Sequence, residues 1–230
     1  MTPLPLVFVV VGDRSYALSE TLHRDALAPL FSDVWTASRV WDASRFLAER
    51  LVRFSSPESP LAFDVRAGQP VLELGSGCGL AGLVASSLGA DVLLTDQAEA
   101  LELLRRNVET NATSESMRAR VDVAEFRWGS EDLLPRSSYR YILVSDCINP
   151  IYGPESWRNL ARTIHRFSHG DTVTYLAHEV RGEDEAMADF LAFCADKLLC
   201  ECIDREGQMS LFRITKIVEE VTMSVDAVLK

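Results

Sequence analysis

The sequence predicts a doubly wound α/β domain built on a mostly parallel sheet of seven strands. Three observations predict it. From residue 70 onward, short apolar segments alternate with segments of helical periodicity. A glycine-rich turn directly follows the first apolar segment, and the last stretch, residues 200–217, has the pattern of two strands around a turn. Strand–helix alternation places helices on both faces of a parallel sheet, and a final hairpin adds antiparallel strands.

Before the sheet, the first 69 residues are expected to form an extension made of a hairpin and helices. The apolar opening, residues 4–11, contains a proline, has no basic residues before it and runs directly into Gly12-Asp13. This pattern favours a hairpin strand over a signal peptide or a membrane span. Residues 39–54 carry apolar side chains at nearly helical spacing and should form an amphipathic helix. Prolines and serines in residues 55–69 indicate a loop.

The core sheet is expected within residues 70–217, and the whole chain, 1–230, is expected to be one domain. The strands are short apolar or alternating runs, and the helices repeat apolar residues at helical spacing. The expected strands cover residues 70–75, 91–96, 120–126, 139–146, 171–179 and two strands in 200–217 around Arg205-Glu206-Gly207. The expected helices cover residues 79–89, 98–111, 154–167 and 183–198.

Composition narrows the class of partner. The chain has 34 acidic and 23 basic residues, a net charge of −11, which counts against a nucleic-acid binder and suits a cationic target such as lysine. The five cysteines include no Cys-x-x-Cys pair, which indicates a reducing, cytoplasmic setting and no metal site. Nothing in the sequence indicates the oligomeric state, so a monomer is the default expectation.

The glycine-rich turn, VLELGSGCGLAGL, fits two cofactor patterns. Gly77, Gly79 and Gly82 match the dinucleotide fingerprint, whereas Gly75, Gly77 and Gly79, preceded by Glu73, match the pattern of S-adenosylmethionine enzymes. Both cofactors need an acid at the end of the second strand for their ribose hydroxyls, and Asp96 provides it. Glu73 suits a cationic amino acid group and is unfavourable beside a pyrophosphate. S-adenosylmethionine is therefore the predicted cofactor.

Several further stretches are shared with one family. They include VWDASRFLAERL, LLRRNVETN, FRWG, ILVSDCI and YLAHEVR. With these, residues 39–217 resemble the methyltransferase-like protein-lysine methyltransferases, which modify chaperones, elongation factors and related ATPases. The resemblance implies a class I, Rossmann-like fold, S-adenosylmethionine as cofactor, and transfer of a methyl group to a lysine of a protein.

The resemblance also implies a role for individual residues. Gly75, Ser76 and Gly77 would line the methionine and ribose part of the cofactor, and Asp96 would bind the ribose hydroxyls. Trp41 would pack near the cofactor, Trp128 would lie at the adenine, and Ser145 with Asp146 would border the sulfonium.

The stretch SDCINPIYG, residues 145–153, allows two interpretations of the catalytic group. Asn149 to Tyr152 resembles the Asn-Pro-Pro-Tyr signature of enzymes that methylate amide or nucleobase nitrogens. In that signature the asparagine leaves the strand directly, whereas here Asp146 holds the strand end and Asn149 follows three residues later. In the lysine methyltransferases the loop commonly reads Asp-x-x-Tyr, often with a second tyrosine and a glycine. Asn149 then replaces the first tyrosine, and Tyr152 with Gly153 keeps the second.

Protein-lysine methylation is the leading hypothesis, with Asp146, Asn149 and Tyr152 as candidate catalytic residues. An amide or nucleic-acid amino-methyltransferase, and a non-catalytic cofactor-binding module, are the alternatives. Asn107 and Asn111 fit the surface and the C-terminal cap of a helix at least as well as a functional role. An acidic group that includes Glu179 and Asp184 could form a rim for a basic substrate or stabilise the first turn of a helix.

Overall fold

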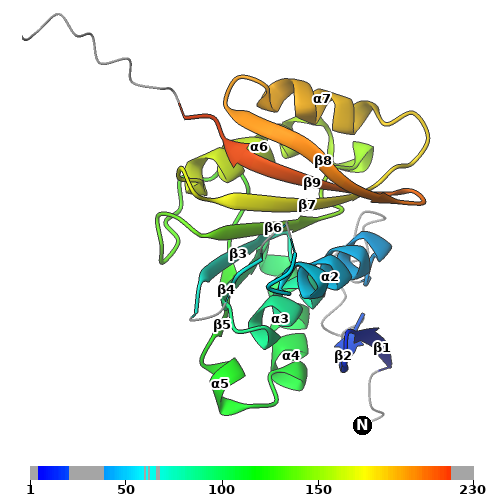
Figure 1. Ribbon diagram of the computed structural model, residues 1–230, viewed down its shortest axis with the longest axis vertical. Helices are drawn as coiled ribbons and strands as arrows, with labels where there is room; N and C mark the ends of the chain where they lie inside the picture. Colours follow the sequence, from blue (N-terminus) through cyan, green and yellow to red (C-terminus); the bar gives the residue numbers. More distant parts are fainter. Residues whose placement is uncertain (1–4, 21–38, 60, 62, 66–67, 219–230) are drawn as a thin grey trace, which may run out of the picture.

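The computed structural model describes residues 5–20, 39–59, 61, 63–65 and 68–218, and its centre is a seven-stranded sheet (Figure 1). The strand order is β5-β4-β3-β6-β7-β9-β8; the first five are parallel, and β9 runs antiparallel to both neighbours. This confirms the predicted doubly wound sheet with an antiparallel end. The strands are β3 (Pro70–Leu74), β4 (Asp91–Asp96), β5 (Val121–Glu125), β6 (Tyr141–Ser145), β7 (Val173–Glu179), β8 (Leu198–Glu206) and β9 (Met209–Lys216).

Helices cover both faces of the sheet (Figure 1). Strand residues alternate between two apolar cores: Tyr141 and Leu143 of β6 belong to one, and Ile142 and Val144 to the other. Residues of α2, α3 and α4 complete the first core, and residues of α6 and α7 complete the second. The helices are α2 (Asp42–Phe54), α3 (Leu80–Ser87), α4 (Leu101–Asn111), α5 (Glu115–Arg118), α6 (Pro154–Phe167) and α7 (Glu185–Cys194), with short 3-10 turns η2 (Ala98–Ala100) and η3 (Pro150–Tyr152).

An N-terminal hairpin of β1 (Leu6–Val11) and β2 (Arg14–Ser19) packs beside α2 and α4 (Figure 1). Val11 pairs with Arg14, so the predicted turn at Gly12-Asp13 is confirmed. Asn107 is fully buried and Asn111 half-buried, and the side-chain amides of both bond the backbone of β2. Asn107 is therefore not a helix-surface residue, because its amide is buried against the backbone of β2. Asn111 ends α4, where its Nδ2 also donates to Asn107 O in the last turn at 2.8 Å.

Several predicted boundaries shift. The helix expected over 183–198 ends at Cys194, because residues 195–197 form a turn and the buried side chain of Leu198 begins β8. The final hairpin turns at Gly207-Gln208, between the paired residues Glu206 and Met209. The short turns α5 and η3 carry no apolar periodicity, and the sequence did not predict them. None of the helices among the described residues has the length and apolar character needed to span a membrane.

Candidate active site

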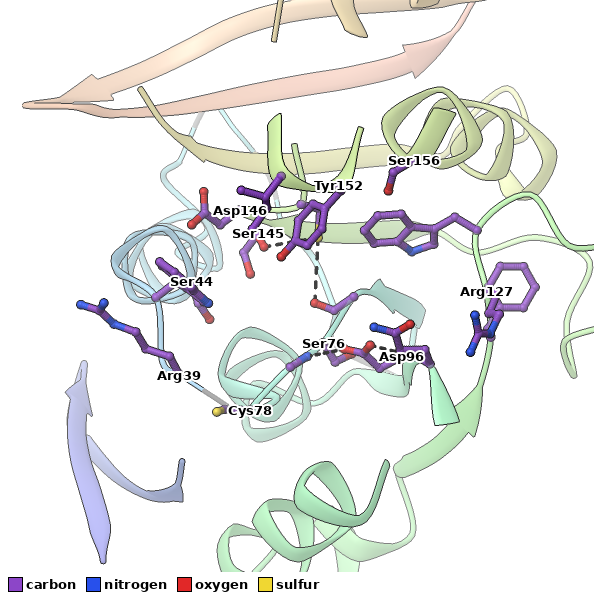
Figure 2. Close-up of a pocket in the computed structure, with 18 of the residues that line it drawn as sticks. Arg39, Ser44, Ser76, Cys78, Asp96, Arg127, Ser145, Asp146, Tyr152 and Ser156 are labelled. Carbon is purple, nitrogen blue, oxygen red and sulfur yellow. Dashed lines mark hydrogen bonds between the residues drawn. The ribbon is translucent and has the colours of Figure 1, made fainter. Parts of the chain in front are cut away.

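A cavity of about 550 Å³ lies where the carboxyl ends of β3, β4 and β6 meet. From β3 the chain continues outward to β4 and β5, and then returns to place β6 on the other side of β3. In doubly wound sheets, ligands bind at this reversal of strand order. Figure 2 shows Ser145, Asp146 and Tyr152 on one side of the space and Ser76 and Asp96 on the other.

The structure brings most of the predicted site residues together around this cavity. The predicted residues that line it are Trp41, Gly75, Ser76, Gly77, Asp96, Trp128, Ser145, Asp146 and Tyr152. Glu73, Gly79 and Asn149 do not line it. Glu73 lies in β3 beneath the glycine loop, Gly79 ends the loop at the start of α3, and Asn149 begins the turn that leads to Tyr152.

The glycine loop approaches the cavity through its backbone. Gly75 has a φ of 67°, and a Cβ atom built there would lie 2.8 Å from both Cys147 Sγ and the Trp128 ring. A side chain at this position would therefore collide with the cavity wall. Ser76 ties the loop to β4, since its Oγ accepts from Thr95 N at 3.0 Å and its own N donates to Thr95 O at 3.0 Å. The loop is a fixed cradle, open toward the cavity.

Asp96 ends β4 and points its carboxylate into the same space (Figure 2). Its oxygens accept hydrogen bonds from Gly77 N and Gln97 N, both at 2.8 Å. Burial raises the pKa of this carboxyl, and the two backbone bonds oppose the rise. A carboxylate has about four lone-pair positions, so two are left for a ligand hydroxyl pair.

Glu73 lies under the loop and is 1% exposed. Its Oε2 accepts from Gly82 N at 3.2 Å, whereas Oε1 has no hydrogen-bond partner. Burial raises the pKa of this carboxyl to about 8, so it is mostly protonated at neutral pH. The negative charge for which the sequence pattern selected Glu73 is therefore largely absent, and the contact seen here is with the first turns of α3.

Asp146 follows β6 and is held in an unusual backbone conformation. Its φ of 56° is the only positive value for a non-glycine residue in the described part of the chain. Both oxygens of its buried carboxylate accept from the Arg181 guanidinium, Oδ1 from Nη1 at 2.9 Å and Oδ2 from Nη2 at 2.6 Å. The Asp146 pair is the main cause that raises the pKa of Arg181. Non-glycine residues with such backbones concentrate at functional sites, which makes Asp146 a candidate by geometry as well as by position.

Two tryptophans border the cavity from different elements. Trp41, at the start of α2, has two cations near its ring: the guanidinium carbons of Arg39 and Arg181 are 5.0 and 5.4 Å from the ring centroid. Trp128 follows β5 and reaches the glycine loop at Gly75. One tryptophan thus stands near Asp146 and the other near the loop, and both are half-buried.

Asn149 has a local partner. Its Oδ1 accepts from Ile151 N at 3.1 Å and caps η3, the turn that brings Tyr152 to the cavity. The backbone of Asn149 is extended, and three residues separate it from the end of β6. The side chain is placed to shape the turn and is not among those lining the cavity.

The acidic group after β7 is divided between two tasks. Glu179 bonds Arg181, next to Asp146. Asp184 caps α7 by accepting from Met187 N at 3.4 Å, and it also bonds His178 Nε2 at 2.6 Å. Asp184 therefore serves the helix start and not a substrate rim.

Sequence reasoning assigned no role to several residues at the cavity. These are Arg39, Val40, Ser44, Cys78, Gln97, Phe126, Arg127, Cys147, Ile151, Ser156 and Asn159, with Arg181 behind Asp146. One signal was available for Arg181: it lies two residues beyond the end of β7, and β7 is parallel to β6. Side chains at the carboxyl ends of neighbouring parallel strands meet at one edge of the sheet.

Comparison with known proteins identifies the family. A family model described as lysine methyltransferase matches residues 32–195, well over half of the chain. The chain belongs to the lysine methyltransferase family. This confirms the family resemblance, the enzyme class and the predicted function.

Among the described residues, the side chains of the types that bind metals form no group of three or more that could hold an ion.

Two kinds of named relative lie within this family. "Protein N-lysine methyltransferase METTL21A" of Danio rerio is 37% identical over 162 residues, covering 70% of this chain and 69% of the relative. The protein of the same name from Xenopus tropicalis is 40% identical and covers 74% and 73%. "EEF1A lysine methyltransferase 3" of Xenopus tropicalis is 26% identical, covering 86% of this chain and 93% of the relative.

Solved structures confirm the fold. A TehB-like SAM-dependent methyltransferase from Corynebacterium glutamicum aligns with a TM-score of 0.55 at 17% identity, covering 84% of this chain and 94% of the other. The glycopeptide N-methyltransferase MtfA aligns with a TM-score of 0.57 at 14% identity, covering 85% and 98%. At these identities the likeness establishes the sheet and its helices, and the substrate has to be argued from the site.

Proposed function

We propose that this lysine methyltransferase uses S-adenosylmethionine to methylate a lysine side chain of a protein substrate. The observation that carries the proposal is one cavity with two different carboxylates at opposite sides, Asp96 and Asp146 (Figure 2). Asp96 stands beside the open glycine cradle, as a nucleoside-binding acid does. Asp146 directly follows β6 and has a positive φ, at the place where a substrate amine would meet the cofactor.

The cavity fits the cofactor in its donor set. Asp96 would hold the ribose hydroxyls, and Trp128 with Phe126 would border the adenine. The backbone of Gly75 to Gly77, which lines the cavity, would approach the methionine part, because the two glycines have no side chain to keep the cofactor away. When bound, S-adenosylmethionine supplies an electrophilic methyl group on a sulfonium. Trp41 and Ser145 would close the cavity around that group.

The task of the chain's own residues is to present a neutral amine in the correct line. A lysine has an ordinary pKa of about 10.4, so its ammonium must lose a proton before the nitrogen can attack. The Asp146 carboxylate and the Tyr152 side chain border the space where the amine would arrive. Asp146 would orient the N–H bonds, and the buried surroundings would favour the uncharged form. Alignment within the cavity then supplies much of the rate, because the reacting groups are held together.

The amide and nucleobase alternative has weaker support. It requires Asn149 to grip the target nitrogen, yet Asn149 Oδ1 already accepts a hydrogen bond within its own turn. The net charge of −11 also opposes binding to a phosphate backbone. The relatives carry names that specify protein lysine, and one name specifies EEF1A. A protein target with an accessible lysine, of the elongation factor, chaperone or ATPase kind, is therefore the proposed substrate class.

The proposed working location is the cytoplasm. All five cysteines carry free thiols in the structure, which suits a reducing compartment. A fluorescent fusion of the full chain, followed by cell fractionation, tests this; recovery in a secreted or organelle fraction would contradict it.

A labelling experiment tests the function. The protein is incubated with methyl-labelled S-adenosylmethionine and cell lysate, and the product is treated with protease or with nuclease. Protease should remove the label, and acid hydrolysis should release methyllysine; methylated adenine or methylglutamine would overturn the proposal.

Asp96→Asn should weaken cofactor binding about tenfold or more, because a charge-assisted bond to the ribose is lost. Asp91→Asn, at the opposite end of the same strand and paired with Arg136 at 3.2 Å, is the matched control and should bind normally.

A further inference from the structure

The Arg181 guanidinium donates a hydrogen bond to each oxygen of the Asp146 carboxylate. The two parallel bonds from Arg181, at 2.9 and 2.6 Å, form a fork that also balances the negative charge. The side chain of Asp146 is 4% exposed, and its backbone N donates to Ala177 O at 3.0 Å on β7. The carboxylate is thus held in place on two sides. Because the bonded carboxylate is only 4% exposed, a second cation has little access to its remaining lone pairs, and a substrate cation that binds it takes the position of Arg181.

The side chain of Arg181 is much less enclosed than that of Asp146. It lies in the irregular segment between β7 and α7, and its side chain is 36% exposed. The next residue, Gly182, has a φ of 65° and open space around it. The same guanidinium also bonds Glu179 and stands over the Trp41 ring. When Arg181 leaves Asp146, its guanidinium therefore keeps the Glu179 carboxylate and the Trp41 ring as partners. The Arg181 charge is then not left unpaired.

We propose that Arg181 is a specificity-determining residue, which the lysine side chain, arriving as an ammonium, must displace from Asp146 toward Glu179 before it loses its proton. This inference rests on the proposed lysine methylation. A guanidinium and an ammonium beside one carboxylate repel each other, so the two cations exclude one another. The displacement has to be driven by contacts made elsewhere between enzyme and substrate. A whole protein surface provides such contacts, and a free lysine does not.

A kinetic comparison tests the competition with a lysine that has no protein around it. The probe is Nα-acetyl-lysine methylamide. Arg181→Met keeps an aliphatic side chain and removes the cation, so kcat/KM for this probe should rise about threefold to tenfold. The affinity for S-adenosylmethionine should stay the same. Arg213→Met is the matched control, since Arg213 is 39% exposed and pairs with Glu201 at 3.1 Å on the β8–β9 hairpin; its kcat/KM should equal that of the wild type.

A purely supporting role for Arg181 predicts a fall in kcat/KM where the proposal predicts a rise. If Arg181 only supports Asp146, Arg181→Met lowers kcat/KM, and that outcome overturns the proposal, as does an unchanged value. Glu179→Gln removes the alternative partner of Arg181, so it should lower kcat/KM for the probe. Arg181→Lys keeps a cation and loses the fork, and it should lie between the wild type and Arg181→Met. This variant serves the test if the methionine variant does not fold.

A binding measurement separates this proposal from the proposed function. In protein labelled with ¹⁵N-arginine, the Nε–H signal of Arg181 is assigned by its loss in Arg181→Met. High concentrations of n-butylammonium should shift this signal, whereas tetramethylammonium, which has no N–H to donate, should not. The shift should vanish in Asp146→Asn. If the signal responds but the enzyme methylates no lysine, the exchange stands and the proposed function fails; an Arg181 signal that ignores butylammonium overturns the exchange itself.

Discussion

The side-chain amide of Asn107 pairs with the backbone of Ser19: Oδ1 accepts from Ser19 N at 2.7 Å, and Nδ2 donates to Ser19 O at 3.0 Å. The same Nδ2 donates to the carbonyl of Cys78 at 3.1 Å, and Cys78 lines the cavity. One fully buried side chain thus joins the N-terminal hairpin, α4 and the glycine loop. The hairpin is bound to the cofactor cradle, although the two are far apart in sequence.

Replacing Asn107 should therefore destabilise the protein and loosen the cradle together. Asn107→Leu has a similar volume but removes three hydrogen bonds to buried backbone groups, so the free energy of unfolding should fall by about 3 kcal/mol or more. Urea denaturation measures this change, and calorimetry should show weaker binding of S-adenosylmethionine. Thr110→Ala, an exposed position on the same helix, is the control and should change stability by less than about 0.5 kcal/mol. A loss below about 1 kcal/mol in Asn107→Leu would show that the hairpin bonds contribute little.

A second prediction separates a collision from backbone strain at two glycines. Gly75 and Gly153 have similar φ angles, 67° and 74°, but a Cβ at Gly75 meets two atoms at 2.8 Å and a Cβ at Gly153 meets nothing within 4 Å. Gly153→Ala should cost only backbone strain, about 1–3 kcal/mol, because φ 74° with ψ 162° is a conformation that essentially only glycine adopts, and cofactor affinity should be unchanged. Gly75→Ala should cost more and should also abolish cofactor binding. Thermal unfolding and calorimetry of both variants check this; equal losses of affinity would argue against the cradle.

The periodic and local features of this chain could be predicted, and the long-range polar contacts could not. The turn at Gly12-Asp13 is encoded in adjacent residues, and the seven strands follow from apolar runs. Asn107 looked like a helix surface residue because its partner, Ser19, lies 88 residues away and presents only backbone groups. Arg181 appeared as one more charged residue after a strand, because its fork with Asp146 depends on how β6 and β7 lie together. The pattern identified Glu73 as a charge, but its burial, which keeps it mostly neutral, depends on α3 packing over it.

The burial of Glu73 predicts an unusual dependence of stability on pH. Its pKa rises from 4.5 to about 8 on folding, so between these values the folded protein holds a proton that the unfolded chain has released. Stability from this group is complete below pH 4.5 and is lost as the pH rises through 8, on the order of 5 kcal/mol at most. Glu73→Gln should remove the dependence and should be more stable than the wild type at pH 8, on the order of 4 kcal/mol.

Urea denaturation at pH 5, 6.5 and 8 measures the Glu73 effect. Glu58→Gln, on an exposed loop, is the control and should follow the wild-type profile. A wild-type protein whose Glu73-dependent stability increases from pH 5 to pH 8 would mean that the carboxylate is charged in the folded state. That result would restore the negative charge beneath the glycine loop that the sequence pattern suggested.

The last prediction decides between the two interpretations of the loop after β6. In the lysine methyltransferases a tyrosine commonly stands where this chain has Asn149, and Asn149 here caps η3 through a bond to Ile151 N. Asn149→Tyr should therefore leave cofactor affinity nearly unchanged and should maintain or raise lysine methylation, because an aromatic side chain would shield the amine from water. Asp146→Ala should abolish methylation, since it removes the carboxylate that orients the amine. Methylation assays with labelled cofactor measure the activity of both variants, and calorimetry measures their cofactor affinity.

Asn149→Ala is the control for the cap of η3: loss of one exposed hydrogen bond should change activity by less than about threefold. If Asn149→Tyr and Asn149→Ala both eliminate activity as completely as Asp146→Ala does, Asn149 touches the target nitrogen. The substrate would then be an amide or a nucleobase rather than a lysine.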